Sequence, residues 1–321
     1  MSKPLFDTVA LIGIGLIGSS ISRGIRRGGL ARRIVGHAQS AATRQTALEL
    51  GLVDAAFDMA AEAAAEADLV VLCVPVGACG LIAASITGQL RAGAILTDVG
   101  SVKGAIVRDV APHVPPGVHF IPGHPIAGTE HSGPRSGFAE LFDGRWCVLT
   151  PPDGTDGKAV DRLKAFWQGL GSHVEVMTPE HHDMVLAITS HVPHLIAFNI
   201  VNTAAHLERV TASEVIKFSA GGFRDFTRIA ASDPTMWRDV FLNNKAAVIE
   251  MLGRFTEDLT ALQRAIRFDD GETLFRLFGE ARQVRRGVIQ AGQDTEVADF
   301  GRLHGSAQAP APSPVAAKGQ G

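Results

Sequence analysis

The chain of 321 residues contains no tyrosine and only 3 cysteines. Cys73, Cys79 and Cys147 are odd in number and form no Cys-x-x-Cys pair, so neither a disulfide framework nor a zinc cluster is expected. Reduced thiols of this kind are typical of a cytoplasmic protein. The lack of tyrosine, by contrast, has no physical consequence for function.

A strong charge of one sign is also lacking, because 33 acidic residues balance 30 basic ones and the net charge is −3. This balance provides no basic surface for nucleic acid or for an anionic membrane. The longest apolar run near the start, residues 9–17, contains glycines, is too short to span a bilayer and lacks the basic opening of a signal peptide. We therefore expect a cytoplasmic protein without nucleic-acid or membrane partners.

The first half of the chain alternates short apolar segments with alanine-rich stretches of helix length. The apolar segments are rich in Val, Ile and Leu without strict alternation, which is typical of strands buried on both faces. We expect strands at residues 8–12, 33–35, 69–74, 94–98, 119–122, 146–149 and 173–176. Strands that alternate with helices predict an α/β fold with a Rossmann-type, doubly wound and mostly parallel sheet.

From about residue 178 the periodicity is helical, and no segment is typical of a strand. Thr178-Pro179-Glu180 and Ser232-Asp233-Pro234 each place a capping residue before a proline, so each predicts a helix start. In the second helix apolar residues recur at heptad spacing, and this heptad seam consists of Phe241, Val248, Phe255 and Leu262 with Leu252, Leu259 and Ile266. The seam predicts packing either within the domain or against a second subunit.

These patterns divide the chain into three parts. Because 321 residues exceed the size at which one core usually stops growing, two folded domains are expected. We predict an α/β domain at residues 1–177 and an all-α domain at residues 178–304. The residues rich in Ala, Pro and Ser at 305–321 predict a disordered tail.

Gly13, Gly15 and Gly18 directly follow the first expected strand and open a helix. In a dinucleotide-binding turn, the first glycine allows the tight turn, the second lets the pyrophosphate approach the backbone, and the third lets helix and strand pack closely. Free N–H groups at the helix N-terminus then attract the phosphates. The predicted cofactor contacts here are Gly13, Gly15, Leu16, Ile17 and Gly18, with Val74 and Pro75 at the end of a later strand.

The end of the second expected strand bears on the choice between NAD and NADP. An acidic residue usually binds the ribose hydroxyls of NAD at this point, but residues 35–40 contain no acid. Gln39 and Ser40 are candidates for hydrogen bonds to the ribose, and Arg44 is a candidate for a 2′-phosphate, while His37 is expected to border the adenine. The cofactor is therefore NAD or NADP.

Three further segments combine reactive side chains with turn-forming residues. Asp98-Val-Gly-Ser-Val-Lys-Gly104 and Gly123-His-Pro-Ile-Ala-Gly-Thr-Glu130 follow expected strands, where ligands of open α/β sheets bind. In the third, Ser190-His-Val-Pro-His194, the serine and the last histidine share a helix face. Pro193 removes a backbone donor from this helix and frees the carbonyl of Thr189.

The histidines near the third segment admit other interpretations. His181, His182, Asp183, His191 and His194 crowd one helix, as metal ligands do, but no cysteine or further carboxylate completes a set at a typical spacing. Each histidine alone is equally compatible with a hydrogen-bonded place in the core. We expect no metal site.

The motifs together resemble those of the prephenate/arogenate (cyclohexadienyl) dehydrogenase family. The phrases that carry the resemblance are Gly15-Leu-Ile-Gly-Ser, Asp98-Val-Gly-Ser-Val-Lys-Gly, Gly123-His-Pro-Ile-Ala-Gly-Thr-Glu, Ser190-His-Val-Pro-His and Gly221-Gly-Phe-Arg-Asp-Phe-Thr-Arg-Ile-Ala-Ala-Ser-Asp-Pro-Thr-Met-Trp237. They occur in the family's order from about residue 8 to 300. The resemblance implies NAD(P)-dependent oxidative decarboxylation of prephenate to 4-hydroxyphenylpyruvate, or of arogenate to tyrosine, by a homodimer joined through the helical domain.

The resemblance also implies roles for individual residues. His124 would accept or polarise the proton of the ring hydroxyl, and Ser101 beside it would hydrogen-bond either the hydroxyl or His124. Arg228 would bind the ring carboxylate, unless it serves instead in an ion pair with Asp225 or Asp233. The remaining substrate residues implied are Ser190 and His194 in the pocket, Thr129 and Glu130 at its gate and rim, and Gly221, Asp225 and Trp237, the last reaching in from either subunit.

Two rival functions remain at this point. One is a β-hydroxyacid dehydrogenase with a similar architecture, which usually carries a catalytic lysine where this chain has Ser190 to His194. The other is a non-catalytic dinucleotide sensor. The sequence does not distinguish prephenate from arogenate, and it does not determine inhibition by tyrosine.

Overall fold

The computed structural model describes residues 3–129, 131–211, 217, 219 and 221–290. Glu130 and the expected tail at 305–321 lie outside the described residues. The chain forms two compact units, one from Met1 to Thr256 and one from Glu257 onward. Both sheets and the residues of the candidate site belong to the first unit. The proposed domain boundary between residues 177 and 178 stays a prediction.

A six-stranded parallel sheet has the strand order β3-β2-β1-β4-β5-β6. Its strands are β1 Phe6–Ile12, β2 Ala31–His37, β3 Ala55–Phe57, β4 Leu69–Leu72, β5 Ile95–Asp98 and β6 His119–Phe120. The predicted doubly wound parallel sheet is confirmed, although β3 was not expected, because three residues show no periodicity. The order reverses between β1 and β4, and such a reversal creates a ligand-binding crevice at the carboxyl ends of the strands.

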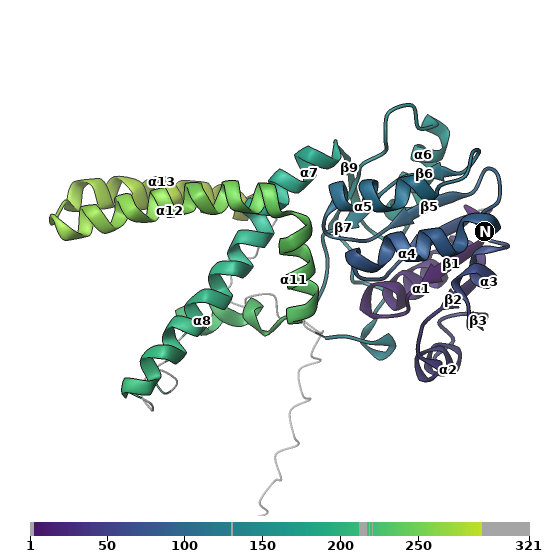
Figure 1. Cartoon of the computed structure of the whole chain (residues 1–321), viewed down its shortest axis with the longest axis horizontal. Coiled ribbons are helices and arrows are strands. Elements are labelled where there is room, and N and C mark those ends of the chain that lie inside the picture. The colour runs from purple at the N-terminus through teal and green to yellow at the C-terminus, as the bar shows by residue number, and fades with distance from the viewer. Residues whose placement is uncertain (1–2, 130, 212–216, 218, 220, 291–321) are drawn as a thin grey trace, which may run out of the picture. The chain divides into compact units, whose positions relative to one another are not determined.

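Helices cover both faces of this sheet (Figure 1). They are α1 Leu16–Gly28, α2 Ala41–Glu49 and α6 Gly157–Gly169 on one face, and α3 Ala60–Ala64, α4 Val76–Ile86 and α5 Lys103–Val110 on the other. Val9 and Leu11 of β1 belong to the first core, while Ala10 and Ile12 belong to the second. Burial on both faces explains why the strand sequences lack polar alternation.

A second sheet, with three strands, was not expected. It contains β7 Gly123–Pro125, β8 Trp146–Leu149 and β9 His173–Val176, with β7 antiparallel to β8 and β9 parallel to it. The predicted strand 119–122 is therefore wrong at its end, because β6 stops at Phe120 and the chain then passes into the second sheet. As a result His124 stands on a strand, opposite Val148.

The rest of the chain is helical, as predicted, and no strand follows β9 among the described residues. Its elements are α7 Pro179–Leu186, a π-helical turn Ala187–His191, α8 Val192–Thr211, α10 Gly221–Thr227, a 3₁₀ turn Arg228–Ala231, α11 Pro234–Asn243, α12 Lys245–Arg267 and α13 Gly271–Gln290. Thr178 accepts a hydrogen bond from the His181 N–H (3.2 Å) and Asp233 accepts one from the Met236 N–H (2.9 Å). Both predicted helix starts are thus confirmed.

The prediction of one continuous helix after Pro234 is wrong. The chain breaks at Asn244, between α11 and α12, where φ is −101° and ψ is 33°. The Asn244 side chain donates hydrogen bonds to the Asp183 carbonyl (2.8 Å) and to Nδ1 of His191 (3.1 Å). Asparagine exchanges helical hydrogen bonds for such side-chain bonds, and a heptad pattern does not reveal that exchange.

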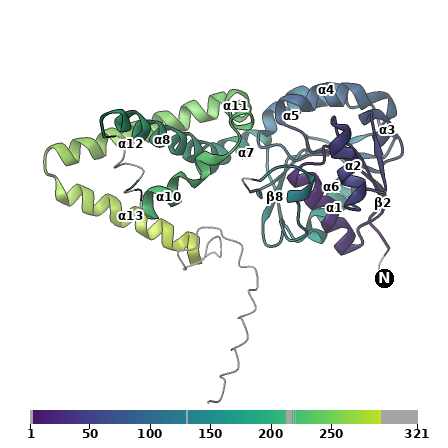
Figure 2. The same ribbon diagram turned by 90° about the horizontal axis from the view of Figure 1, so that it is seen from below.

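The heptad seam divides between buried and exposed positions. Val248 is buried within the chain, beside Val192, whereas Leu259 and Ile266 are 52% and 64% exposed. Figure 2 shows the chain reversing direction between α12 and α13, and Asp269 at this reversal has a positive φ of 57°. The first residues of the seam therefore pack in the core of the first unit, whereas apolar side chains farther along α12 remain exposed.

Candidate active site

The glycine turn lies between the end of β1 and the start of α1. A Cβ on Gly18 would lie 2.2 Å from the carbonyl oxygen of Gly13, so the third glycine is required by close packing. Gly15 differs, because a Cβ there would meet nothing within 4 Å, and as the N-cap of α1 it makes no side-chain hydrogen bond. Open space beside an uncapped helix N-terminus fits a dinucleotide pyrophosphate.

The other predicted cofactor contacts lie at the same edge of the sheet. His37 ends β2, and Ser40 caps α2 by accepting a hydrogen bond from a backbone N–H. Val74 and Pro75 follow β4, with Pro75 as the N-cap of α4. Because these positions follow the carboxyl ends of strands next to the crevice, they can surround a cofactor, and their individual contacts stay predictions.

Arg44 is tied to the loop that follows β2. Its Nη1 donates to the carbonyls of Ala38 (2.7 Å) and Gln39 (3.1 Å), and its Nη2 forms an ion pair with Asp58 (2.6 Å). Asp58 directly follows β3, a strand that the sequence did not predict. An acid does therefore reach this end of the sheet, but it comes from the neighbouring strand and binds the guanidinium.

A pocket of about 350 Å³ lies within the first unit. Its lining includes seven of the side chains that the sequence singled out, namely Ser101, His124, Thr129, Ser190, His194, Arg228 and Trp237. Its apolar lining includes Leu186, Ile229 and Met236. A concave, mixed site of this size suits a small polar molecule with an apolar ring.

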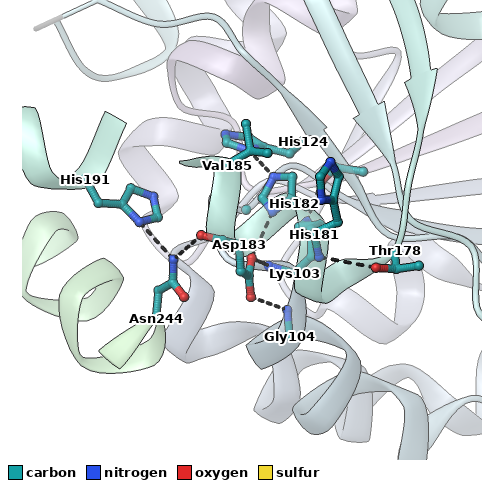
Figure 3. Close-up of polar contacts among 12 residues, drawn as sticks. Lys103, Gly104, His124, Thr178, His181, His182, Asp183, Val185, His191 and Asn244 are labelled. Atoms are coloured by element: carbon teal, nitrogen blue, oxygen red, sulfur yellow. Dashed lines mark hydrogen bonds and ion pairs between the residues drawn. The ribbon is translucent and has the colours of Figure 1, made fainter. Parts of the chain in front are cut away.

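On the side away from the pocket, His124 is the first member of a hydrogen-bonded series of buried side chains (Figure 3). Its Nδ1 lies 2.8 Å from Nε2 of His182, and Nδ1 of His182 lies 2.8 Å from a carboxylate oxygen of Asp183. That carboxylate also accepts hydrogen bonds from the backbone N–H groups of Lys103 and Gly104, both at 2.8 Å. The hydrogen-bonded series therefore ends at the N-terminus of α5, which favours the negative charge of the Asp183 carboxylate.

A buried ion pair supports the same strand ends. The Lys103 ammonium donates to the carboxylate of Asp98 and to the carbonyl of Gly123, and both side chains of the pair are fully buried. Asp98 also accepts hydrogen bonds from the N–H groups of Gly100 (2.7 Å) and Gly123 (3.1 Å). These bonds fix the residues on either side of Ser101 and the strand that carries His124.

The buried position keeps His124 neutral. Burial is the main cause that holds the pKa of His124 well below its ordinary value of 6.5, and the neighbouring His182, Lys103 and His191 lower it further. Burial also lowers the pKa of His182, although the Asp183 carboxylate opposes that shift. A neutral imidazole with one unprotonated nitrogen is the form that a general base requires at neutral pH.

The π-helical turn directs the third motif toward the pocket. Ser190 and His194 line the pocket, whereas His191 points into the core and has its pKa lowered to about 4, chiefly by burial. Pro193 cannot donate to the carbonyl of Thr189, which explains why the regular helix is interrupted here. His194 donates from Nδ1 to the Ser190 carbonyl (2.8 Å) and stacks on Trp237 at 3.7 Å.

The remaining predicted substrate residues have mixed outcomes. Trp237 lines the pocket of its own chain, and a contribution from the Trp237 of a second subunit stays a prediction. Gly221 and Asp225 are not among the described residues that line it, and Asp225 pairs with Arg224 (3.2 Å). Asp233 caps α11. Asp225 and Asp233 each have a contact of their own, and an ion pair between either of them and Arg228 stays a prediction.

Sequence reasoning missed the supporting residues behind His124. His182 and Asp183 appeared there only as candidate metal ligands, and the described residues contain no group of three or more side chains that could hold a metal ion. Lys103, Asp98 and Asn244 received no role. Their common signal is a polar residue at a position that the fold buries, and this signal becomes visible only once the segments are assembled.

Comparison with known proteins agrees with this geometry. The model of the prephenate dehydrogenase nucleotide-binding domain matches residues 21–176, and that of the prephenate dehydrogenase dimerization domain matches residues 178–280. Cyclohexadienyl dehydrogenase from Zymomonas mobilis is 39% identical over 281 residues, which cover 88% of this chain and 96% of that protein.

The chain belongs to the prephenate dehydrogenase family.

Solved structures of family members are also similar to it. Prephenate dehydrogenase from Aquifex aeolicus, in complex with hydroxyphenyl propionate and NAD⁺, has a TM-score of 0.83 at 36% identity, with 90% of this chain and 99% of that chain covered. The arogenate dehydrogenase of Synechocystis has a TM-score of 0.74 at 27% identity, with 87% and 99% covered. This family member is accordingly an NAD(P)-dependent oxidoreductase, and the sensor and β-hydroxyacid readings are set aside.

Proposed function

We propose that this enzyme oxidises and decarboxylates prephenate, arogenate or both, and so supplies 4-hydroxyphenylpyruvate or tyrosine for tyrosine biosynthesis. One observation carries the proposal: a buried histidine and an arginine line one pocket at the carboxyl edge of a dinucleotide-binding sheet. The substrate requires an acceptor for the proton of its ring hydroxyl and a cation for its ring carboxylate. His124 and Arg228 provide these two groups.

The residues of the pocket divide the chemistry among them. A bound nicotinamide would accept a hydride from the ring carbon that carries the hydroxyl. Nε2 of His124 takes the hydroxyl proton as that carbon becomes a carbonyl, and Ser101 hydrogen-bonds beside it. Loss of carbon dioxide from the opposite ring carbon then leaves its bonding electron pair to the ring, which becomes aromatic. The carbonyl oxygen takes back the proton from Nε2 of His124 and is a hydroxyl again.

Further side chains hold the substrate. The planar guanidinium of Arg228 can bind the ring carboxylate with two parallel hydrogen bonds. Ser190 and His194, which line the pocket, would meet the side-chain carboxylate or the keto or amino group, and Trp237 would provide an apolar wall. Thr129, which lines the pocket, forms its gate in this proposal.

The function is tested by reduced-cofactor formation with the purified protein, crossing prephenate and arogenate with NAD and NADP. Activity in any of the four combinations is the expected result, and the pattern of rates gives the substrate and cofactor preferences together. Silence in all four from a folded protein that binds dinucleotide would contradict the proposal.

For the cofactor we propose a preference for NAD. A 2′-phosphate needs a free cation, and Arg44 is the candidate cation at the end of β2. Asp58 already neutralises Arg44 across 2.6 Å, and two backbone carbonyls hold the guanidinium in place. Because Asp58 would repel the phosphate as well, NAD is the better fit.

We also propose that the enzyme is a soluble, cytoplasmic homodimer joined through its C-terminal helices. The stretch Pro179–His206 is long and apolar enough by composition to cross a membrane, and only 28% of its most apolar window is buried. The same stretch carries the hydrogen-bonded pair His182 and Asp183, and Nδ1 of its His191 accepts a hydrogen bond from Asn244. Apolar side chains are likewise exposed on α12 and α13, as at Ile266 and Phe275. Coverage by a second copy of the same helices fits these faces better than lipid does.

A further inference from the structure

The three side chains behind the pocket fix which nitrogen of His124 carries a proton. Both oxygens of Asp183 act as acceptors, since they accept backbone N–H groups from α5. The 2.8 Å contact with Nδ1 of His182 therefore requires that His182 donates from this nitrogen. A neutral His182 then carries no proton on Nε2, which can only accept.

The tautomer of His182 in turn determines the tautomer of His124. Its Nδ1 lies 2.8 Å from the accepting Nε2 of His182, so Nδ1 of His124 must carry the proton. Neutral imidazole has a single N–H, which leaves Nε2 of His124 without a proton. Since His124 lines the pocket and its Nδ1 is engaged behind it, Nε2 is the atom available to the substrate.

We propose that His182 is the positioning residue of this enzyme: with Asp183 it locks His124 in the tautomer whose unprotonated Nε2 accepts the substrate proton, a role that rests on the dehydrogenase function proposed above. When Nε2 of His124 takes the hydroxyl proton, the ring becomes an imidazolium and keeps its Nδ1–H bond to His182. His182 also holds the ring plane, since the two rings meet edge to face at 5.1 Å.

The surroundings of the pair favour this neutral arrangement. The charged or titratable groups that bear on His124 are His182 of α7, Lys103 at the start of α5 and His191 of the π-helical turn, and each lowers its pKa. The Asp183 carboxylate acts one ring farther away, on His182. Gly104 permits its close approach, because a Cβ there would lie 2.9 Å from the carboxylate oxygen.

Two variants separate this role from simple packing. His182→Phe keeps an aromatic ring but removes the acceptor, so His124 loses its tautomer preference and kcat falls by about 100-fold or more, as expected when a base carries its proton on the wrong atom. His182→Gln provides an amide oxygen in a similar place and should restore part of kcat. The KM of the substrate and the affinity for NAD should change little in both.

The matched control is His181→Phe. His181 is the exposed neighbour on the same helix, and the hydrogen bond recorded for it is that of its backbone N–H to Thr178. Wild-type kcat is expected for this control. The acid limb of kcat/KM should lie below pH 6.5 in the wild type and the control, because the pKa of His124 is lowered, and should move in His182→Phe.

The deciding measurement is histidine ¹⁵N NMR of the full-length protein without substrate. A proton on Nδ1 of both His124 and His182 in the wild type, lost from His124 in His182→Phe, is the expected result. A proton on Nε2 of wild-type His124, or a wild-type kcat in His182→Phe, would overturn the proposal. Because the NMR needs no substrate, a wild-type enzyme with the expected tautomers but no activity would count against the proposed function alone. If His182→Phe does not fold, the tautomer of His124 in the wild type and the kcat of His182→Gln still test the proposal.

Discussion

The cofactor edge and the substrate pocket of the first unit are built in different ways. The cofactor edge is centred on backbone: the glycine turn from Gly13 to Gly18 and the N-terminus of α1, which lie close together in sequence, with the ends of neighbouring strands beside them. The pocket consists of side chains from segments far apart, since His124 stands on β7, His182 on α7 and Arg228 in the turn before α11. The first site needs small residues, and the second needs buried polar ones that support one another.

The difference explains where each site is vulnerable. A backbone site fails when a side chain is added, because a Cβ occupies the space of the ligand or of a packed strand. A side-chain site fails when a group is removed, because its buried partners lose a hydrogen bond that water cannot replace. Changes of opposite kind should therefore break the two sites separately.

The largest effect is expected from His124→Asn in the pocket. Loss of a positioned base lowers rates by about two to four orders of magnitude, so kcat should fall by that much while NAD affinity is retained. Steady-state kinetics and a cofactor titration on the same preparation measure both quantities. An unchanged kcat would remove His124 from the mechanism.

Arg228→Ala should act on binding. An unpaired substrate carboxylate in the pocket costs roughly 2–5 kcal/mol, so the substrate KM rises strongly and NAD affinity stays. Arg224→Ala is the matched control, because Arg224 is exposed and pairs with Asp225. A wild-type KM in Arg228→Ala would show that Arg228 is structural.

The buried histidines near the pocket should make the free energy of unfolding depend on pH. The pKa of His191 is lowered from 6.5 to about 4, so the unfolded chain binds its proton first and stability falls as the pH drops through this interval. For this residue the loss is about 3 kcal/mol. His191→Gln should weaken the dependence in urea unfolding at pH 7 and pH 4.5, and equal losses in both proteins would contradict the assignment.

Adding a methyl group should break the cofactor edge in two distinguishable ways. Gly15→Ala meets no protein atom within 4 Å, so the fold should remain while NAD binds roughly 10- to 100-fold more weakly, as expected for 1–3 kcal/mol of steric conflict. Gly18→Ala clashes with the Gly13 carbonyl and should lower the melting temperature as well. Unchanged NAD affinity in Gly15→Ala would place the pyrophosphate elsewhere.

The smallest effect is expected from Asp58→Asn. Releasing Arg44 from an exposed ion pair should raise kcat/KM for NADP relative to NAD by about fivefold, in line with the energy of about 1 kcal/mol of such pairs. In Asp58→Asn/Arg44→Ala the gain should disappear. An unaltered ratio in the single variant would mean that Arg44 does not face the 2′ position.

The sequence predicted local features well and assembled features less well. The glycine turn, the strand periodicity and the caps at Thr178 and Asp233 depend on residues within a few positions of one another. The break at Asn244 depends on bonds to Asp183 and His191, more than fifty residues away, and the heptad spacing continued through it. His182 resembled a metal ligand until the fold placed it between His124 and Asp183.

The central claim is tested most directly by following reduced cofactor and carbon dioxide in one reaction of the purified protein with prephenate and NAD. The account predicts one molecule of carbon dioxide for each molecule of reduced cofactor. In His124→Asn the rates at which the two products form should fall by the same factor. Reduced cofactor without carbon dioxide, or neither product from folded protein that binds NAD and is also silent with arogenate, would contradict it.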